Sequence, residues 1–377
     1  AQGKRPLAPP TPPAPPGGRQ GRAQMALRTR VAALPLVPLR PHPVREASVV
    51  WAVGRYLFAY DTAASKWEQC RKERHGDAVR ALDAYVEQGE GEGAAGEVLW
   101  ISGGDDKQVI IWRERGSDWE SMKELPHPKK IVAAIFDRSG RALFADRFGD
   151  VYRWAWRSAE ADGEPQLLFG HLAIVTAMVL TASGSFLVTG DNHEKVRVSC
   201  YPGAAEIHSF CLGHTAQITA LACLGDEAVV SASADGTLRL WRLDGEQTQL
   251  HDLGASVSSL AAKADGSVIL GCEGTPGLRS VELQGKAEAA AEALADELPQ
   301  AVCALRGGAV LWVDRAGHLR MRAAAGSWEH AFEGEDLPPA LVCLSKNADP
   351  NWSEEAGAQE EGAGAEAAAR PRKRRNK

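Results

Sequence analysis

Residues 229–241 read VVSASADGTLRLW, and this stretch decides the fold. Two short runs rich in β-branched and aliphatic residues flank an Asp-Gly pair at 235–236. An Asp-Gly pair between two such runs indicates a tight turn that joins antiparallel strands. In this stretch Ser231, Asp235 and Trp241 stand at a fixed spacing. The same spacing occurs earlier in the chain at Ser102, Asp106 and Trp112.

The body of the chain repeats with a long period. Four histidines share one local frame, in which a β-branched residue follows after four positions and an apolar residue after seven. Two leucines continue this frame, so that the six anchors are His75, His127, His171, His214, Leu253 and Leu298. Successive anchors lie 39 to 52 residues apart. Because Asp, Gly and Ser turns separate short strand-like runs in every unit, we expect about four strands per repeat.

This repeat resembles the WD-repeat β-propeller, an all-β fold. In that family, one His, Ser or Thr, Asp and Trp of a blade form a hydrogen-bonded tetrad that fixes the turns between strands. The resemblance implies two such tetrads here, one of His75, Ser102, Asp106 and Trp112 and one of His214, Ser231, Asp235 and Trp241. Buried polar groups are stable only when each finds a partner, which gives the tetrad its physical basis.

Six repeats leave strand-like residues at both ends of the body. Val49 to Tyr60 precede the first anchor and Ala340 to Leu344 follow the last unit. A blade shared between these two ends would close the ring and remove exposed sheet edges. We therefore expect a seven-bladed propeller over residues 48–350. The Ala- and Glu-rich residues 284–298 favour a short helix inserted between two blades.

Both ends of the chain have compositions typical of disorder. Residues 1–47 hold 11 of the 21 prolines, and their first acidic residue is Glu46. This segment also resembles an organelle transit peptide, and a leader read through upstream of Met25 explains it equally well. Residues 351–377 are expected to be disordered and end in a basic cluster of Arg370, Arg372, Lys373, Arg374, Arg375 and Lys377. Such a cluster indicates nuclear import or contact with RNA.

Several classes of function are disfavoured by composition. The formal net charge of −6 excludes a uniformly basic nucleic-acid coat. The longest apolar stretch, Leu172 to Leu180, has about half the length that a membrane span needs. Seven cysteines without C-x-x-C spacing argue against a zinc site or a disulfide framework and indicate reduced thiols.

No motif predicts catalysis or a bound cofactor. Residues 87–96 contain G-x-G-x-x-G, but a dinucleotide or S-adenosylmethionine loop connects a strand to a helix, and here a strand follows. Asp105 and Asp106 are adjacent carboxylates in a turn, and the tetrad accounts for Asp106. We expect a protein that is not an enzyme and that has no metal or cofactor.

Three stretches resemble one family more closely. They are FADRFGDVY at 144–152, FLVTGDNHEKVRVSCYP at 186–202 and IHSFCLGHT at 207–215. They are similar to the WD-repeat, non-catalytic subunit of the eukaryotic tRNA (guanine-N7)-methyltransferase. The resemblance implies that a separate S-adenosylmethionine-dependent subunit carries out catalysis and that this chain binds and stabilises it as a heterodimer. It also implies that tRNA is bound mainly through the complex, with N7-methylguanosine formed in the variable-loop region.

The same resemblance implies a contact surface for the catalytic subunit. Its expected residues are Arg147, Asp150, Asp191, Asn192, His193, Glu194 and Lys195. Asn192 stands where the family carries a basic residue, and His193 and Phe148 stand where the tetrad Asp would fall. The turn at Arg147 to Asp150, which gives up the tetrad Asp, suggests a contact surface, and decay of the repeat is the alternative explanation.

Two other functions stay open at this point. A generic WD-repeat scaffold, such as a substrate receptor of a ubiquitin ligase or a chromatin adaptor, would use the same fold. A propeller hydrolase would need a central cluster of catalytic side chains, for which the sequence holds no motif. The basic C-terminal cluster favours a nuclear protein that takes part in tRNA processing.

Overall fold

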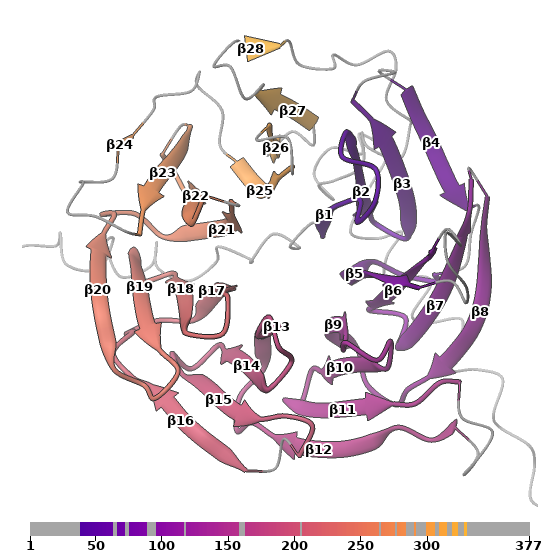
Figure 1. Cartoon of the computed structure of the whole chain (residues 1–377), viewed down its shortest axis with the longest axis horizontal. Helices are drawn as coiled ribbons and strands as arrows, with labels where there is room; N and C mark the ends of the chain where they lie inside the picture. Colours follow the sequence, from indigo (N-terminus) through magenta and orange to yellow (C-terminus); the bar gives the residue numbers. More distant parts are fainter. Residues whose placement is uncertain are drawn as a thin grey trace, which may run out of the picture. The chain divides into compact units, whose positions relative to one another are not determined.

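The computed structural model describes residues 38–62, 66–71, 75–88, 96–116, 118–157, 163–203, 206–263, 265–275, 277–283, 290–291, 299–305, 309–314, 319–322 and 328–329. Over these residues the chain forms seven four-stranded antiparallel sheets, each built from consecutive strands. The sheets stand side by side as blades around a centre, with the first strand of each blade innermost (Figure 1). The prediction of an all-β, seven-bladed propeller is confirmed.

Each blade takes four strands in chain order. Blades 1 and 2 consist of β1 (Leu39–Pro41), β2 (Ser48–Val53), β3 (Tyr56–Asp61) and β4 (Lys66–Arg71), then β5 (Val79–Glu87), β6 (Glu97–Gly104), β7 (Gln108–Arg115) and β8 (Asp118–Pro126). Blades 3 and 4 consist of β9 (Ile131–Phe136), β10 (Ala142–Asp146), β11 (Asp150–Trp154) and β12 (Gln166–Gly170), then β13 (Val175–Leu180), β14 (Phe186–Asp191), β15 (Val196–Cys200) and β16 (Ile207–Cys211).

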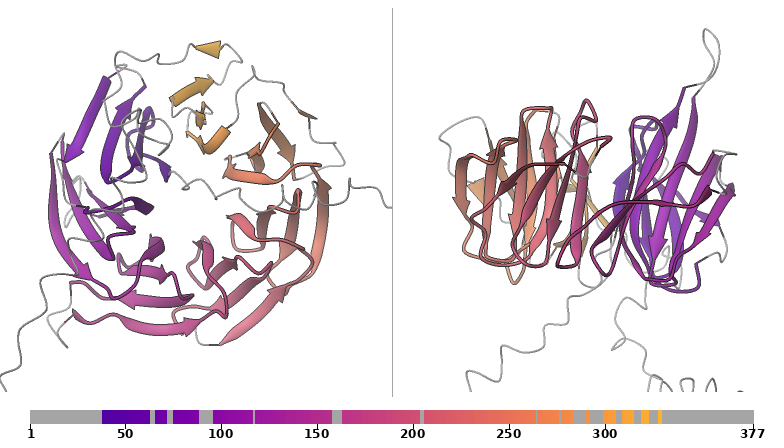
Figure 2. Two further views of the ribbon diagram at one scale, coloured as in Figure 1. Left: turned by 180° about the vertical axis from the view of Figure 1, so that it is seen from behind. Right: turned by 90° about the horizontal axis from the view of Figure 1, so that it is seen from below.

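The last three blades follow the same plan. They consist of β17 (Ile218–Leu224), β18 (Ala228–Ser233), β19 (Thr237–Arg242) and β20 (Gln247–Asp252); β21 (Val257–Ala262), β22 (Ser267–Cys272), β23 (Leu278–Glu282) and β24 (Ala290–Ala291); and β25 (Pro299–Ala304), β26 (Val310–Asp314), β27 (Leu319–Arg322) and β28 (Trp328–Glu329). The strands run between the two faces of the ring, so that turns and loops gather on these faces (Figure 2). Within the described ranges, no helix is long and apolar enough to cross a membrane.

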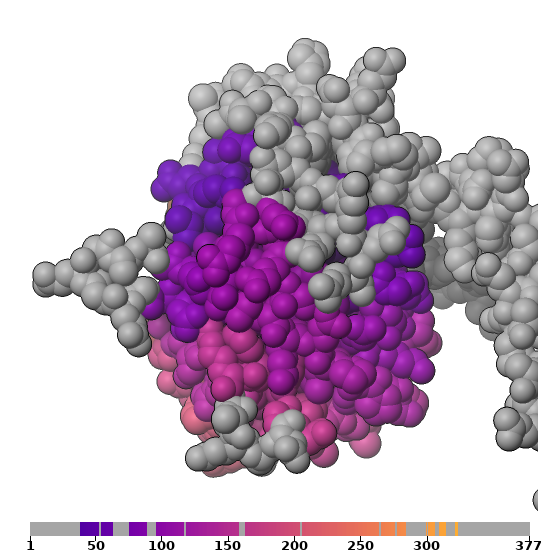
Figure 3. Space-filling view, turned by 90° about the vertical axis from the view of Figure 1, so that its right-hand side faces the viewer, coloured from indigo at the N-terminus to yellow at the C-terminus, as the bar shows by residue number. Residues whose placement is uncertain are grey.

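The core lies between the blades. Seven hydrophobic clusters each combine residues of two neighbouring blades. Tryptophans supply much of this packing: Trp100, Trp112 and Trp119 lie between blades 1 and 2, and Trp154 and Trp156 between blades 2 and 3. These side chains are buried between neighbouring blades. The space-filling view shows one side of the ring, where atoms of successive strands pack closely against one another (Figure 3).

Ring closure differs from the predicted shared blade. Blade 1 is complete without residues 340–344, which lie outside the described residues, because Leu39–Pro41 supplies its first strand. The expected boundary at residue 48 is therefore wrong, because the blade begins at Leu39. The rest of the expected disordered segments, residues 1–37 and 351–377, lies outside the described residues. Blades 1 and 7 are joined by side-chain packing instead, in a cluster that includes Trp51, Tyr60 and Leu311.

Two further expectations need correction in the last blades. Ala290–Ala291 is a strand paired with β23, so at these positions the predicted helix over 284–298 is wrong; its other residues lie outside the described part. The repeat frame predicted that Val302 in blade 7 is equivalent to Val257 in blade 6. In the structure the equivalent residue is Pro299, three residues earlier, because Pro299 pairs with Asp314 as Val257 pairs with Cys272. Proline is acceptable there because it stands first in its strand.

Candidate partner-binding site

Blade 2 carries one of the tetrads that the sequence predicted. The Trp112 indole N–H donates to Ser102 Oγ (2.7 Å), and this hydroxyl lies 2.7 Å from His75 Nε2. His75 Nδ1 lies 2.8 Å from Asp106 Oδ2, which also accepts the backbone N–H of Gly76. The structure thus brings all four residues together. We call this arrangement the latch, because it ties the loop before a blade to the turn between its second and third strands.

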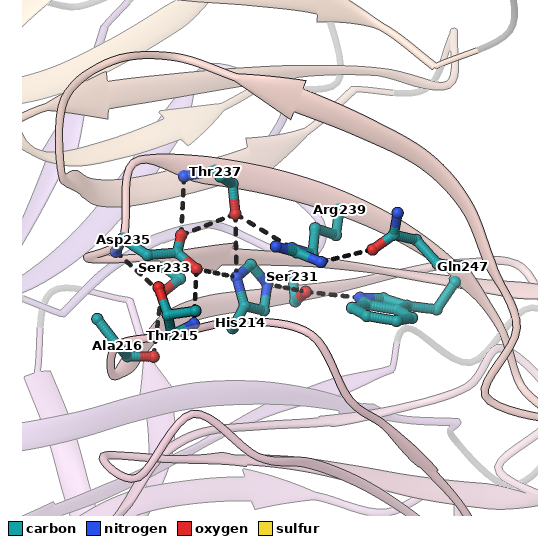
Figure 4. A network of polar contacts seen from close by, with 10 residues as sticks. His214, Thr215, Ala216, Ser231, Ser233, Asp235, Thr237, Arg239 and Gln247 are labelled. Carbon is teal, nitrogen blue, oxygen red and sulfur yellow. Dashed lines mark hydrogen bonds and ion pairs between the residues drawn. The ribbon is translucent and has the colours of Figure 1, made fainter.

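Blade 5 holds the second predicted latch in the same geometry (Figure 4). His214 lies 2.7 Å from Ser231 Oγ and 2.9 Å from Asp235 Oδ2, and the Trp241 indole donates to the same serine. Thr237 adds a hydroxyl that donates to Asp235 Oδ1 (2.7 Å). Because His214 and Ser231 are buried, these hydrogen bonds replace the ones that both side chains make to water in the unfolded chain.

Burial and hydrogen bonding shift the pKa values of this latch. Burial lowers the pKa of His214, because the charged imidazolium loses its hydration; the Asp235 carboxylate opposes this only in part. Burial alone would raise the pKa of Asp235. The Thr215 N–H, the Thr237 hydroxyl and His214 instead favour the carboxylate and hold its pKa at about 2.

Acid is therefore expected to destabilise the fold. The His214 imidazole has an ordinary pKa of 6.5 and a lower one when folded, so unfolding is favoured as pH falls below about 6.5. The Asp235 contribution is fully present above its ordinary pKa of 3.8 and is lost as pH falls towards about 2. Urea unfolding at a series of pH values should show both effects. Asp235→Asn should flatten the profile below about pH 4, whereas the exposed Glu282→Gln should not; equal profiles for both variants would contradict the assignment.

Blades 3 and 4 build the latch differently. Their carboxylates stand two residues earlier in the turn than Asp106 and Asp235 do. Asp146 Oδ2 lies 3.2 Å from His127 Nε2, and Asp191 Oδ2 lies 3.3 Å from His171 Nδ1. Both aspartates are buried, and each also accepts backbone N–H groups of its own turn. In these two blades the earlier carboxylate thus contacts the latch histidine in place of the usual one.

Because an earlier residue supplies the carboxylate in blades 3 and 4, the usual aspartate position holds another residue type. Phe148 occupies it in blade 3 and His193 in blade 4, and both side chains are exposed, Phe148 by 63%. The structure contradicts the expectation that Asp191 contacts a partner, because Asp191 is 2% exposed and engaged in the latch. Blade 4 also lacks the latch tryptophan, since Ser199 stands at its position, where it accepts a hydrogen bond from Arg197 (2.8 Å).

The other residues expected at the surface fall into two groups. Arg147, His193, Glu194 and Lys195 are exposed. Asp150 and Asn192 are half-buried, and the Asn192 carboxamide oxygen accepts the Ile174 N–H (2.9 Å). Asn192 therefore positions the loop before β13, which explains why an amide, and no basic side chain, stands there.

Two apolar side chains at this place were not predicted. Leu172 is 99% exposed in the loop between β12 and β13, and Phe148 carries the Lys129 ammonium 4.0 Å from its ring centroid. The sequence signalled Phe148 only as a departure from the repeat. Leu172 directly follows the latch histidine, where Gly76 and Thr215 stand in blades 2 and 5, and this contrast was the available signal.

These residues form one continuous surface. The loop that carries Leu172 lies between the two turns, because the His171 N–H donates to Gly149 O (2.9 Å) and the Asn192 N–H donates to Ile174 O (2.9 Å). Gly149 has a φ of 90°, and a Cβ there would lie 2.3 Å from Ala173 O, so the close approach requires glycine. We call this surface the blade 3–4 rim; it comprises Arg147, Phe148, Leu172, His193, Glu194 and Lys195.

The fold defines a class of protein: a WD-repeat propeller, here with exposed apolar and charged side chains on the turns of blades 3 and 4. Across the described part of the chain, no group of three or more His, Cys, Asp or Glu residues could hold a metal ion. Residues 155–295 match the family model described as the tRNA methyltransferase TRM82 WD40 domain. The predicted resemblance to this family is thereby confirmed over residues 155–295.

Curated relatives carry the same description. The chain is 33% identical over 161 residues to the tRNA (guanine-N(7)-)-methyltransferase non-catalytic subunit wuho of Drosophila pseudoobscura pseudoobscura, covering 42% of this chain and 40% of the relative. It is 30% identical over 160 residues to the subunit wdr4 of Dictyostelium discoideum, covering 37% and 34%. The match thus spans about two fifths of the length of these relatives.

A solved structure supports the fold alone. The β-propeller domain of Cps50 (Swd1) from Myceliophteria thermophila superposes with a TM-score of 0.61 at 14% identity. The superposition covers 74% of this chain and 93% of that domain. At this identity the likeness extends to the architecture and carries no information on partners.

Proposed function

We propose that this chain is the non-catalytic subunit of a tRNA (guanine-N7)-methyltransferase. In this proposal it binds and stabilises a separate S-adenosylmethionine-dependent subunit that forms N7-methylguanosine in the variable-loop region of tRNA. The names of its relatives support the assignment. The structural observation that carries it is the blade 3–4 rim, where displaced latch carboxylates leave two turn positions to solvent.

The composition of the rim suits a protein partner. Specific interfaces combine a few large apolar anchors with a surrounding ring of polar residues. Phe148 and Leu172 are the large exposed apolar residues here, and charged side chains of both signs surround them. The charges are unequal, because Arg147 and Lys195 oppose the single acid Glu194. We therefore expect an acidic partner face with an apolar recess.

A rigid propeller is well suited to support a catalytic partner. The interblade clusters and the latches of blades 3 and 4 hold the backbone turns that carry the rim. Contacts from a preformed surface order the partner's loops at a smaller entropic cost than contacts between two mobile surfaces. In this way a non-catalytic chain raises the activity of another.

Charge reversal at the rim tests the proposal. Arg147→Glu combined with Lys195→Glu should weaken binding to the catalytic subunit by about tenfold or more, because like charges then face each other. The measurement is titration calorimetry with the purified catalytic subunit, followed by methyl transfer to a tRNA transcript with and without this chain.

A matched control keeps the net change in charge constant. Lys123→Glu combined with Arg242→Glu reverses two exposed charges on β8 and at the end of β19, away from the rim. This variant should bind as the wild type does. Equal affinities for all three proteins would remove the rim from the interface, and methyl transfer by this chain alone would overturn the proposed function.

A further inference from the structure

Four basic residues lie next to the blade 3–4 rim, three on loops of blades 2 and 3 and one at the start of β5. They are Arg80, Lys107, Lys129 and Lys130. The Lys107 carbonyl accepts the His127 N–H (2.7 Å), and the Lys130 carbonyl accepts the Arg147 N–H (2.9 Å). These bonds place Lys107 and Lys130 next to the rim. Lys129 joins them through its contact with the Phe148 ring, and Arg80 joins them through Asp105, which also contacts Lys130. We call them the basic strip.

The strip keeps a positive charge even though the chain as a whole is acidic. Asp105 is shared, since its Oδ2 lies 2.6 Å from an Arg80 nitrogen and 3.4 Å from Lys130 Nζ. Asp105 therefore pairs with two of the four cations. Asp77 and Asp106 lie in the same loops, so four basic and three acidic residues leave a net excess of one positive charge. Lys107 and Lys129 are exposed, and neither has an ion pair among the described residues. A local positive potential on a chain with net charge −6 attracts polyanions to this place.

The chemistry of the strip differs from that of the rim. Its loops, residues 75–80, 105–107 and 127–130, contain none of the exposed large hydrophobic residues of the described chain. Lysine is depleted in the cores of protein–protein interfaces, whereas lysine and arginine supply most contacts to phosphates. The strip thus fits a nucleic-acid backbone better than it fits a second protein surface.

We propose that the basic strip contacts the phosphate backbone of tRNA bound to the complex. The proposal rests on the proposed function and extends it, because it gives the propeller a direct share in RNA binding. Lys129 is the link between the two surfaces, since its ammonium lies over the Phe148 ring at the edge of the rim. An RNA held by a subunit docked on the rim would pass next to the strip.

Removing two positive charges from the strip tests this proposal. In the full complex, Lys107→Gln combined with Lys129→Gln should raise the Kd for a tRNA transcript roughly three- to tenfold near 0.15 M salt. The slope of log K against log salt should fall by about 1.5, because two phosphate contacts are lost. Lys123→Gln combined with Arg242→Gln removes the same charge elsewhere and should leave both quantities unchanged.

Three outcomes would overturn the proposal or separate it from the proposed function. An unchanged salt slope in the Lys107→Gln, Lys129→Gln complex would overturn it. Weaker binding between the subunits with an unchanged slope would assign the strip to the protein interface and also overturn it. If the chain failed to bind the catalytic subunit at all, the proposed function would fail. In that case tRNA binding by the full chain alone would be measured against salt concentration. A slope that is unchanged by Lys107→Gln and Lys129→Gln would show that the basic strip makes no phosphate contacts.

Discussion

Asp191→Ala is expected to lower the free energy of unfolding by about 2–3 kcal/mol. The Asp191 side chain is buried. Its Oδ2 lies 3.3 Å from His171 Nδ1, and its Oδ1 accepts the backbone N–H groups of His193 and Lys195. Removing the carboxylate leaves several of these groups without a partner, because no other acceptor is bonded to them. Hydrogen bonds hold the pKa of Asp191 below its ordinary value although burial raises it, so the carboxylate is charged at neutral pH. Chemical denaturation near pH 7 measures the effect.

The comparison with His193→Ala separates the latch from the rim. His193 is exposed two residues further on, so its loss should change stability by less than about 0.5 kcal/mol. Asp191→Ala should weaken partner binding only through the smaller folded fraction, whereas His193→Ala should act on binding directly. A stable Asp191→Ala variant with selectively weakened binding would return Asp191 to the interface that the family resemblance implied.

The repeat frame and two latches could be predicted because they depend on short-range spacing. Strand, turn and strand need the same residue types at the same separation wherever they occur, as at Ser231 and Trp241. The first strand of blade 1 lacked such a signal. Leu39–Pro41 is only three residues long and lies in a proline-rich segment, and its place is fixed by packing between blades 1 and 7.

The site was harder to predict than the fold. A carboxylate two residues earlier in a tight turn reaches the same histidine, but a one-dimensional spacing rule does not show this equivalence. The sequence therefore placed Asp191 in the contact surface and marked Phe148 only as part of a turn that departs from the tetrad pattern. Exposure is also a property of the folded chain, and the only signal for Leu172 in the sequence was its place after the latch histidine, where Gly76 and Thr215 stand in blades 2 and 5. Only the fold shows that it points to solvent.

Removal of the two apolar anchors should have the largest effect on partner binding. Phe148→Ala and Leu172→Ala should each weaken binding to the catalytic subunit roughly 30-fold, since a central anchor contributes about 2 kcal/mol or more. Together they should weaken it more than a hundredfold. Stability should change little, because Phe148 is 63% and Leu172 99% exposed. The control is Leu250→Ala, which truncates a 50% exposed leucine on β20 and should bind normally. Surface plasmon resonance with immobilised catalytic subunit measures all four variants. If both single variants bind within threefold of the wild type, the rim's energy lies in its charges, and the apolar recess expected on the partner does not exist.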